Sequence, residues 1–195
     1  MSSVKPISLV FALLTLATGA AAEPLVRIQT ELGVIELELA TAKAPATVAN
    51  FLKHVDAGRY TGGQFHRTVK IHPDNQPNSP VKIEVIQGGV NPAFAEKDRP
   101  PIALERTSVT GLKHLDGTLS MARDGPDTAT SDFFICIGDQ PALDFGGRRN
   151  PDGQGFAAFG RVTKGLAIVR KIQSAPADGQ KLTPSIGIVR IERMP

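Results

Sequence analysis

Cysteine is almost absent from this chain of 195 residues, and tryptophan is absent altogether. The single cysteine, Cys136, excludes an internal disulfide, so the fold has to be stabilised by a packed core alone. Cys136 stands in a β-rich apolar run, where we expect a small, buried hydrophobic side chain. A long apolar run that would cross a membrane is also missing, with one shorter candidate near the N-terminus.

Several motifs of cofactor and metal chemistry are missing too. The four histidines show no H-E-x-x-H or similar ligand spacing, so we expect no metal site. No G-x-G-x-x-G lies between a strand and a helix, so we expect no dinucleotide and no other cofactor. The net charge of +3 is small, and no basic stripe alternates with aromatic residues. Nucleic acid is therefore not an expected partner.

Residues 1–22 have the layout of a secretory signal peptide. Lys5 supplies the positive charge, residues 7–17 are mainly apolar, and residues 20–22 (Ala-Ala-Ala) offer a cleavage site before Glu23. The apolar run is shorter than the roughly 20 residues of a bilayer span, which favours cleavage over an uncleaved anchor. We therefore expect a periplasmic or secreted protein that has no membrane attachment after cleavage.

The remaining residues, 23–195, have the length of a single domain, and we expect a monomer. Apolar residues with helical spacing predict two helices. The first opens at residues 44–47, where Pro45 suits the first turn, and ends at Gly58. The second covers residues 164–173.

Short apolar or alternating segments between turn signals predict strands. They cover residues 25–30, 34–39, 64–69, 81–87, 118–122, 133–137, 156–162 and 186–192. The proline- and asparagine-rich residues 72–80 cannot be a central strand, residues 102–110 are ambiguous, and Arg148-Arg149 is expected at a solvated loop tip. Many strands and two helices predict a closed antiparallel barrel or a sandwich, and periodicity alone does not choose between them.

The stretch that is most specific runs from residue 117 to 138, GTLSMARDGPDTATSDFFICIG. It resembles the central signature of cyclophilin-type peptidyl-prolyl isomerases, G-x-L-S-M-A-x-x-G-P-x-T-x-x-S-Q-F-F-I. Further matches follow in the family's order: Phe65-His66-Arg67, Gln87-Gly88-Gly89 and Phe159-Gly160-Arg161-Val162. The resemblance covers most of the chain after about residue 25. It implies a mainly β fold, a closed eight-stranded antiparallel β-barrel capped by a helix at each end.

The chemistry that the resemblance implies is rotation about X-Pro peptide bonds. Such a bond prefers trans by only about 0.5–1 kcal/mol, but its rotation barrier is roughly 18–20 kcal/mol because the prolyl nitrogen shares its lone pair with the carbonyl. A catalyst therefore needs a donor to that nitrogen and a pocket that holds the ring, and it needs no metal, nucleophile or base. By resemblance, Arg67 is the catalytic donor, and a guanidinium suits this role because it is rigid and always charged.

The resemblance also assigns substrate-binding positions around Arg67. Gln87 helps to orient the arginine, the main chain of Ala122 and Arg123 pairs with the peptide, Phe134 is the floor of the proline pocket, and Leu143 is a wall. The further positions expected to line the site are His66, Val85, Asp132 and Phe156. The substrates would be proline-containing peptides and unfolded proteins.

The sequence departs from the better-known family pattern at several of these positions. Glu84-Val85 replaces Phe-Met, Asp132 replaces glutamine, Ala142 replaces tryptophan, and Phe156 replaces histidine. Period 2 places Val85 on the same face as Gln87 and Glu84 on the other, although Glu84 or Asp132 could also pair with Arg67 and compete for its donors. The segment between Arg67 and Gln87 is also longer than in compact family members.

These departures leave alternatives beside the enzyme that assists protein folding. One is a catalytically weak proline-peptide binding protein or chaperone on the same scaffold. The other is a barrel that carries a small apolar ligand. Arg67 and Phe134 favour the isomerase, whereas Asp132, Ala142 and Phe156 keep the binding protein open.

Overall fold

A computed structural model describes residues 22–94 and 100–195, and the statements below concern these residues. The predicted signal peptide, residues 1–22, lies outside the described residues except for its last alanine. Within the described ranges, no helix has both the length and the apolar character that crossing a bilayer requires.

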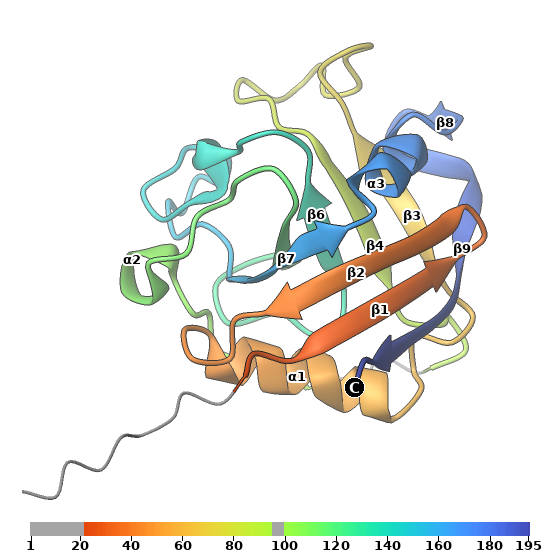
Figure 1. The fold of residues 1–195 in the computed structure, drawn as a ribbon. Coiled ribbons are helices and arrows are strands. Elements are labelled where there is room, and N and C mark those ends of the chain that lie inside the picture. The colour runs from red at the N-terminus through yellow and green to blue at the C-terminus, as the bar shows by residue number, and fades with distance from the viewer. Residues whose placement is uncertain (1–21, 95–99) are drawn as a thin grey trace, which may run out of the picture.

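Eight antiparallel strands form a closed barrel (Figure 1). Around the barrel the order is β1-β2-β7-β5-β6-β4-β3-β9, and β1 pairs with β9 to close it. The strands are β1 (Leu25–Thr30), β2 (Gly33–Leu39), β3 (Gly63–Val69), β4 (Val85–Gly89), β5 (Thr118–Met121), β6 (Phe133–Cys136), β7 (Ala158–Lys164) and β9 (Lys181–Arg193). A two-residue strand, β8 (Ala177–Asp178), pairs only with β9. The eight-stranded antiparallel barrel expected from the sequence is confirmed.

The two predicted helices are α1 (Pro45–Asp56) and α3 (Leu166–Gln173), which lie at the lower and upper ends of the barrel in Figure 1. Pro45 occupies the first turn of α1, where its missing N–H leaves no hydrogen bond unmade, and Gly58 follows the helix with a φ of 64°. The two helices that were expected to cap the barrel are confirmed. A third, α2 (Thr107–Thr110), forms in the segment that periodicity left ambiguous.

The barrel interior is filled by aliphatic side chains and a group of aromatic rings. The phenyl ring of Phe51 from α1 packs on Phe133 with centroids 5.7 Å apart and on Phe159 at 5.3 Å. Neighbouring residues of a strand face opposite sides, so Phe133 of β6 points into this core while Phe134 belongs to a second, smaller cluster. The members of that second cluster are Val69, Ile83, Val85, Phe134, Cys136 and Leu143.

Cys136 is fully buried in this second cluster, as expected. Burial raises the pKa of its thiol far above the ordinary value, with smaller contributions from nearby carboxylates such as Asp144. The thiol is therefore a packing group and not a nucleophile.

Some predicted strand ends are wrong, and the largest difference lies before β4. Residues 81–84 were expected in a strand, but they belong to an irregular segment, residues 70–84, here called the β3–β4 loop. The side-chain amide of Gln76 accepts a hydrogen bond from the Ile83 N–H (3.2 Å) and donates to the Ile83 carbonyl (2.8 Å). This amide satisfies the backbone groups that a neighbouring strand would otherwise pair.

Three further boundaries shift as well. β7 and α3 each begin two residues later than expected, at Ala158 and Leu166. β9 begins five residues earlier, at Lys181, because the short β8 supplies a partner for its first residues.

Candidate active site

A pocket of about 370 Å³ opens over the second apolar cluster. Nine of the ten predicted site residues line it: Arg67, Val85, Gln87, Ala122, Arg123, Asp132, Phe134, Leu143 and Phe156. The tenth, His66, lies beside the pocket, where its Nε2 is 3.6 Å from the Asp132 carboxylate. The structure thus brings together residues from β3, β4, β6 and the loops that follow β5 and β6.

Three of the pocket residues lie in a row across neighbouring strands. Arg67 of β3 is directly opposite Gln87 of β4, and Gln87 is directly opposite Phe134 of β6. Residues that are directly opposite in an antiparallel pair project to the same face of the sheet. The row spans two strand spacings, about 10 Å, so a guanidinium and a phenyl ring lie at the two ends of a surface the size of a dipeptide.

The pocket floor is apolar and closely supported. Phe134 is 5% exposed, and the ring of Phe156 stands edge-on to it with centroids 5.3 Å apart. Behind Phe134, the imidazole of His114 stacks in parallel at 6.0 Å. Val85 and Leu143 extend the apolar lining. This surface suits a compact apolar ring such as that of proline.

His114 is held by polar partners of its own. Its Nδ1 lies 2.8 Å from Asp144 Oδ1, and its Nε2 lies 3.0 Å from Ser120 Oγ. Burial alone would raise the pKa of the Asp144 carboxyl, but hydrogen bonds from the His114 side chain and backbone, and the charge of Lys113, outweigh it and lower that pKa. Ser120, His114 and Asp144 are all buried and none of them lines the pocket, so they support the floor and do not reach a substrate.

The Arg67 guanidinium is held from two sides by neutral amides. Nη1 donates to Gln87 Oε1 (2.9 Å), while Nε and Nη2 both donate to Gln180 Oε1 (2.9 and 2.7 Å). Three of its five N–H groups are thus used, which leaves one on each Nη. Burial, and secondly the charge of Arg149, lower the pKa of Arg67, which nevertheless remains charged near neutral pH.

The two acidic residues near Arg67 are engaged differently. Glu84 accepts hydrogen bonds from the Ile71 N–H (3.4 Å) and from Gln173 Nε2 (3.1 Å), on the side opposite Val85 and Gln87. The period-2 prediction for Glu84 is therefore right, and Glu84 has partners other than Arg67. Asp132 accepts from Gln87 Nε2 (3.3 Å), so that Gln87 bridges the arginine and this carboxylate.

The side chain of Arg123 turns away from the open pocket. It is 1% exposed, it donates to the Gly155 carbonyl (2.8 and 2.6 Å), and it pairs with both oxygens of Asp152 (2.8 and 3.0 Å). Its guanidinium also lies over the Phe156 ring, 5.0 Å from the centroid. Arg123 therefore fixes the segment that carries Phe156, which leaves its main chain to face the pocket.

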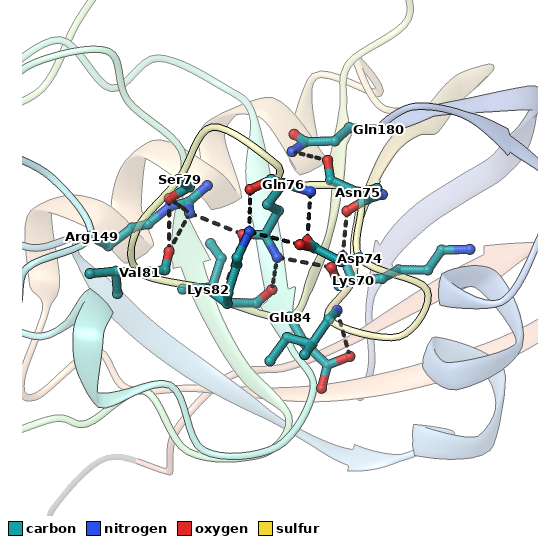
Figure 2. Close-up of polar contacts among 12 residues, drawn as sticks. Lys70, Asp74, Asn75, Gln76, Ser79, Val81, Lys82, Glu84, Arg149 and Gln180 are labelled. Carbon is teal, nitrogen blue, oxygen red and sulfur yellow. Dashed lines mark hydrogen bonds and ion pairs between the residues drawn. The ribbon is translucent and has the colours of Figure 1, made fainter.

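Sequence reasoning missed two polar residues here. Arg149 lines the pocket and is half-buried, whereas Arg148 is exposed. Nη1 of Arg149 donates to Gln76 Oε1 (3.0 Å), to the Val81 carbonyl (2.6 Å) and to Ser79 Oγ. The prediction of a solvated tip is therefore wrong for Arg149, because the longer β3–β4 loop supplies its partners (Figure 2). Gln180 is the second polar residue that was missed, and no local sequence pattern marked it as part of the site.

Five other lining residues were not singled out either. Asp124, Thr128 and Thr130 belong to the signature loop, and the polar character of these positions was the signal that could have identified them. The other two residues are Ile83 and Asn150. Over the described ranges 22–94 and 100–195, no group of three or more His, Cys, Asp or Glu side chains is arranged to hold a metal ion.

Comparisons with known proteins agree with this geometry. The family model described as "Cyclophilin type peptidyl-prolyl cis-trans isomerase/CLD" matches residues 25–193. A peptidyl-prolyl cis-trans isomerase of Acinetobacter baylyi is 34% identical over 174 residues, which cover 89% of this chain and 84% of the relative. Peptidyl-prolyl cis-trans isomerase A of Dickeya dadantii is 37% identical over 155 residues, which cover 78% of this chain and 73% of the relative.

Among solved structures, a cyclophilin type peptidyl-prolyl cis-trans isomerase of Cryptosporidium parvum, crystallised in the presence of the dipeptide Ala-Pro, is similar with a TM-score of 0.69 and 26% identity. The match covers 88% of this chain and 99% of that one. The barrel, the signature residues gathered at one pocket and the family model that spans nearly all described residues lead to one conclusion: this chain belongs to the cyclophilin-type peptidyl-prolyl cis-trans isomerase family.

Proposed function

We propose that this peptidyl-prolyl isomerase lowers the rotation barrier of an X-Pro bond through a hydrogen bond from Arg67 to the prolyl nitrogen. The observation that carries the proposal is the row Arg67–Gln87–Phe134. A proline ring on Phe134 would lie within reach of the two unused N–H groups of the guanidinium. As the bond twists, the nitrogen regains its lone pair and becomes an acceptor, so this hydrogen bond strengthens only toward the transition state.

Each neighbouring residue has a role in this mechanism. Val85, Phe134, Leu143 and Phe156 hold the proline ring, so that the carbonyl on its N-terminal side is the part that rotates. The Ala122 N–H is already donated to the Asp132 carbonyl (2.9 Å), so we assign peptide pairing to the Ala122 carbonyl and the Arg123 main chain. His66 and Asp132 border the site and would meet residues that flank the proline.

The test compares Arg67→Ala with Phe134→Ala. Loss of a preorganised donor to a transition state costs about 3–4 kcal/mol, so Arg67→Ala should lower the isomerisation rate on the order of a hundredfold to a thousandfold. Peptide affinity should change much less. Phe134→Ala should weaken binding and rate together, because the ring is held in every state of the bond.

A protease-coupled assay on a short X-Pro peptide gives the rate, calorimetry gives the affinity, and circular dichroism verifies the fold. Arg67→Ala with a wild-type rate would overturn the donor role. A wild-type protein that binds peptide but shows no isomerase activity would support the binding-protein alternative instead.

We also propose that the protein is exported, that residues 1–22 are removed, and that it assists the folding of proline-containing proteins in the periplasm or outside the cell. The support for export is the layout of the N-terminal sequence.

A further inference from the structure

The β3–β4 loop, residues 70–84, is organised around one buried amide. Gln76 is 2% exposed, and its Nε2 donates to the carbonyls of Lys70 (2.9 Å) and Ile83 (2.8 Å), which joins the two ends of the loop. Its Oε1 accepts from Ile83 and from Arg149 of the facing loop. Figure 2 shows these contacts converging on Gln76 from both sides. The loop is therefore a defined structural unit.

The next residue back, Asn75, joins this unit to the end of the barrel. Its Oδ1 accepts from the Lys70 N–H (2.8 Å), while its Nδ2 donates to the carbonyls of Thr68 (2.9 Å) and Gly179 (3.0 Å). Gly179 lies in the turn between β8 and β9, immediately before Gln180. Asn75 thereby holds the loop, strand β3 and this turn in one arrangement.

The side-chain amide of Gln180 lies between Asn75 and Arg67. Its Nε2 donates to the Asn75 carbonyl (3.0 Å; Figure 2), and its Oε1 accepts from both Nε and Nη2 of Arg67. The two contacts specify one orientation of the amide, because a flipped amide would direct N–H groups at the guanidinium and an oxygen at the Asn75 carbonyl. The carbonyl of Asn75 thus determines that Gln180 presents an acceptor to Arg67.

The geometry points to Gln180 as a positioning residue for Arg67, controlled by the β3–β4 loop through Asn75. This inference rests on the proposed donor role of Arg67. An arginine has four flexible side-chain torsions, and Gln87 alone constrains only Nη1. Gln180 holds the opposite edge through Nε and Nη2, and the two unused N–H groups then point in a defined direction. Because Gln180 is neutral, it orients the guanidinium without neutralising the charge that the twisted bond requires.

The experiment replaces Gln180 with methionine, which keeps the size of the side chain and removes the acceptor. We expect kcat/KM in the protease-coupled assay to fall about tenfold, since small misplacements of a catalytic group carry losses of this order or larger. The Kd of a short X-Pro peptide should stay within about twofold, because the apolar floor is unchanged. Rates are divided by the concentration of binding sites from calorimetry, so a partly unfolded sample does not imitate the effect.

Gln173→Met is the matched control. Gln173 is also a glutamine that ties the β3–β4 loop, through Glu84 (3.1 Å), but it does not contact Arg67 in the described structure. We expect its kcat/KM to remain within about twofold of wild type. Asn75→Ala is a second variant, and it should lower kcat/KM in the same direction as Gln180→Met because it releases the carbonyl that orients the amide.

A double-mutant cycle separates positioning from a general structural role. If Gln180 acts through Arg67, Gln180→Met should cost nothing further in the Arg67→Ala background. A wild-type kcat/KM for Gln180→Met, an equal loss in both backgrounds, or an equal loss for Gln173→Met would each overturn the inference. Failure of the underlying donor role gives a different result, since Arg67→Ala itself would then keep the wild-type rate.

Discussion

Arg149 provides a sharp test of how the β3–β4 loop is held against the rest of the pocket. A single nitrogen, Nη1, donates to acceptors on Gln76, Ser79 and Val81 across the space between two loops. Arg149→Met retains most of the apolar stem and removes the guanidinium. The substitution therefore removes these three hydrogen bonds, here called the Arg149 clamp, and removes little apolar packing.

The size of the effect follows from what remains after the clamp is lost. Gln76 Oε1 keeps the Ile83 N–H as a partner, and the Val81 carbonyl keeps the Ser79 hydroxyl (2.8 Å). The Ser79 hydroxyl is only partly buried, so water can replace the Arg149 donor there, and the three contacts do not add. We expect the loss of about one charged hydrogen bond, roughly 1.5–3 kcal/mol of unfolding free energy. For a chain of this length that corresponds to a melting temperature lower by about 3–12 °C.

Arg148 is the matched control because it is the preceding residue and is exposed. Urea unfolding and thermal melts of Arg148→Met should give values within about 0.5 kcal/mol of wild type. The two variants carry the same change in charge and composition, so their difference isolates the clamp. Equal stabilities for Arg148→Met and Arg149→Met would refute the view that Arg149 holds the loop.

Two further predictions concern export and pH. Mass spectrometry of the exported protein should find Glu23 at the N-terminus, and a mature chain that still begins near Met1 would indicate a membrane anchor instead. The folded-state pKa of Asp144 is lowered, so its contribution to stability is present above the ordinary aspartate pKa of about 3.9 and is lost as the pH falls through the lower folded value. Asp144→Asn should therefore destabilise the protein at pH 7, by urea unfolding, and this deficit should shrink below about pH 4; a deficit that grows there would contradict the assignment.

Much of the barrel could be predicted from local sequence. Strand periodicity and turn residues act over a few positions, which is why β1, β2, α1 and the strands of the signature were placed to within a residue or two. The alternation expected over residues 84–87 also predicted that Val85 and Gln87 share a face while Glu84 does not. The choice of a barrel over a sandwich, and the roles of the pocket residues, came from the family resemblance and not from periodicity.

Tertiary structure alone decided how the guanidinium of Arg67 is held. Gln180 is 113 residues away in the chain, and Arg149 is 68 residues from its acceptor Val81, so no local pattern relates them. The proline and asparagine residues of the β3–β4 loop excluded a central strand, but they did not show that the Gln76 amide replaces a strand partner. Short-range preferences thus determined which segments form the barrel. The polar contacts that orient Arg67 depend on the pairing of β3 with both β4 and β9, because only these pairings between distant segments bring Arg67, Gln87 and the turn before β9 together.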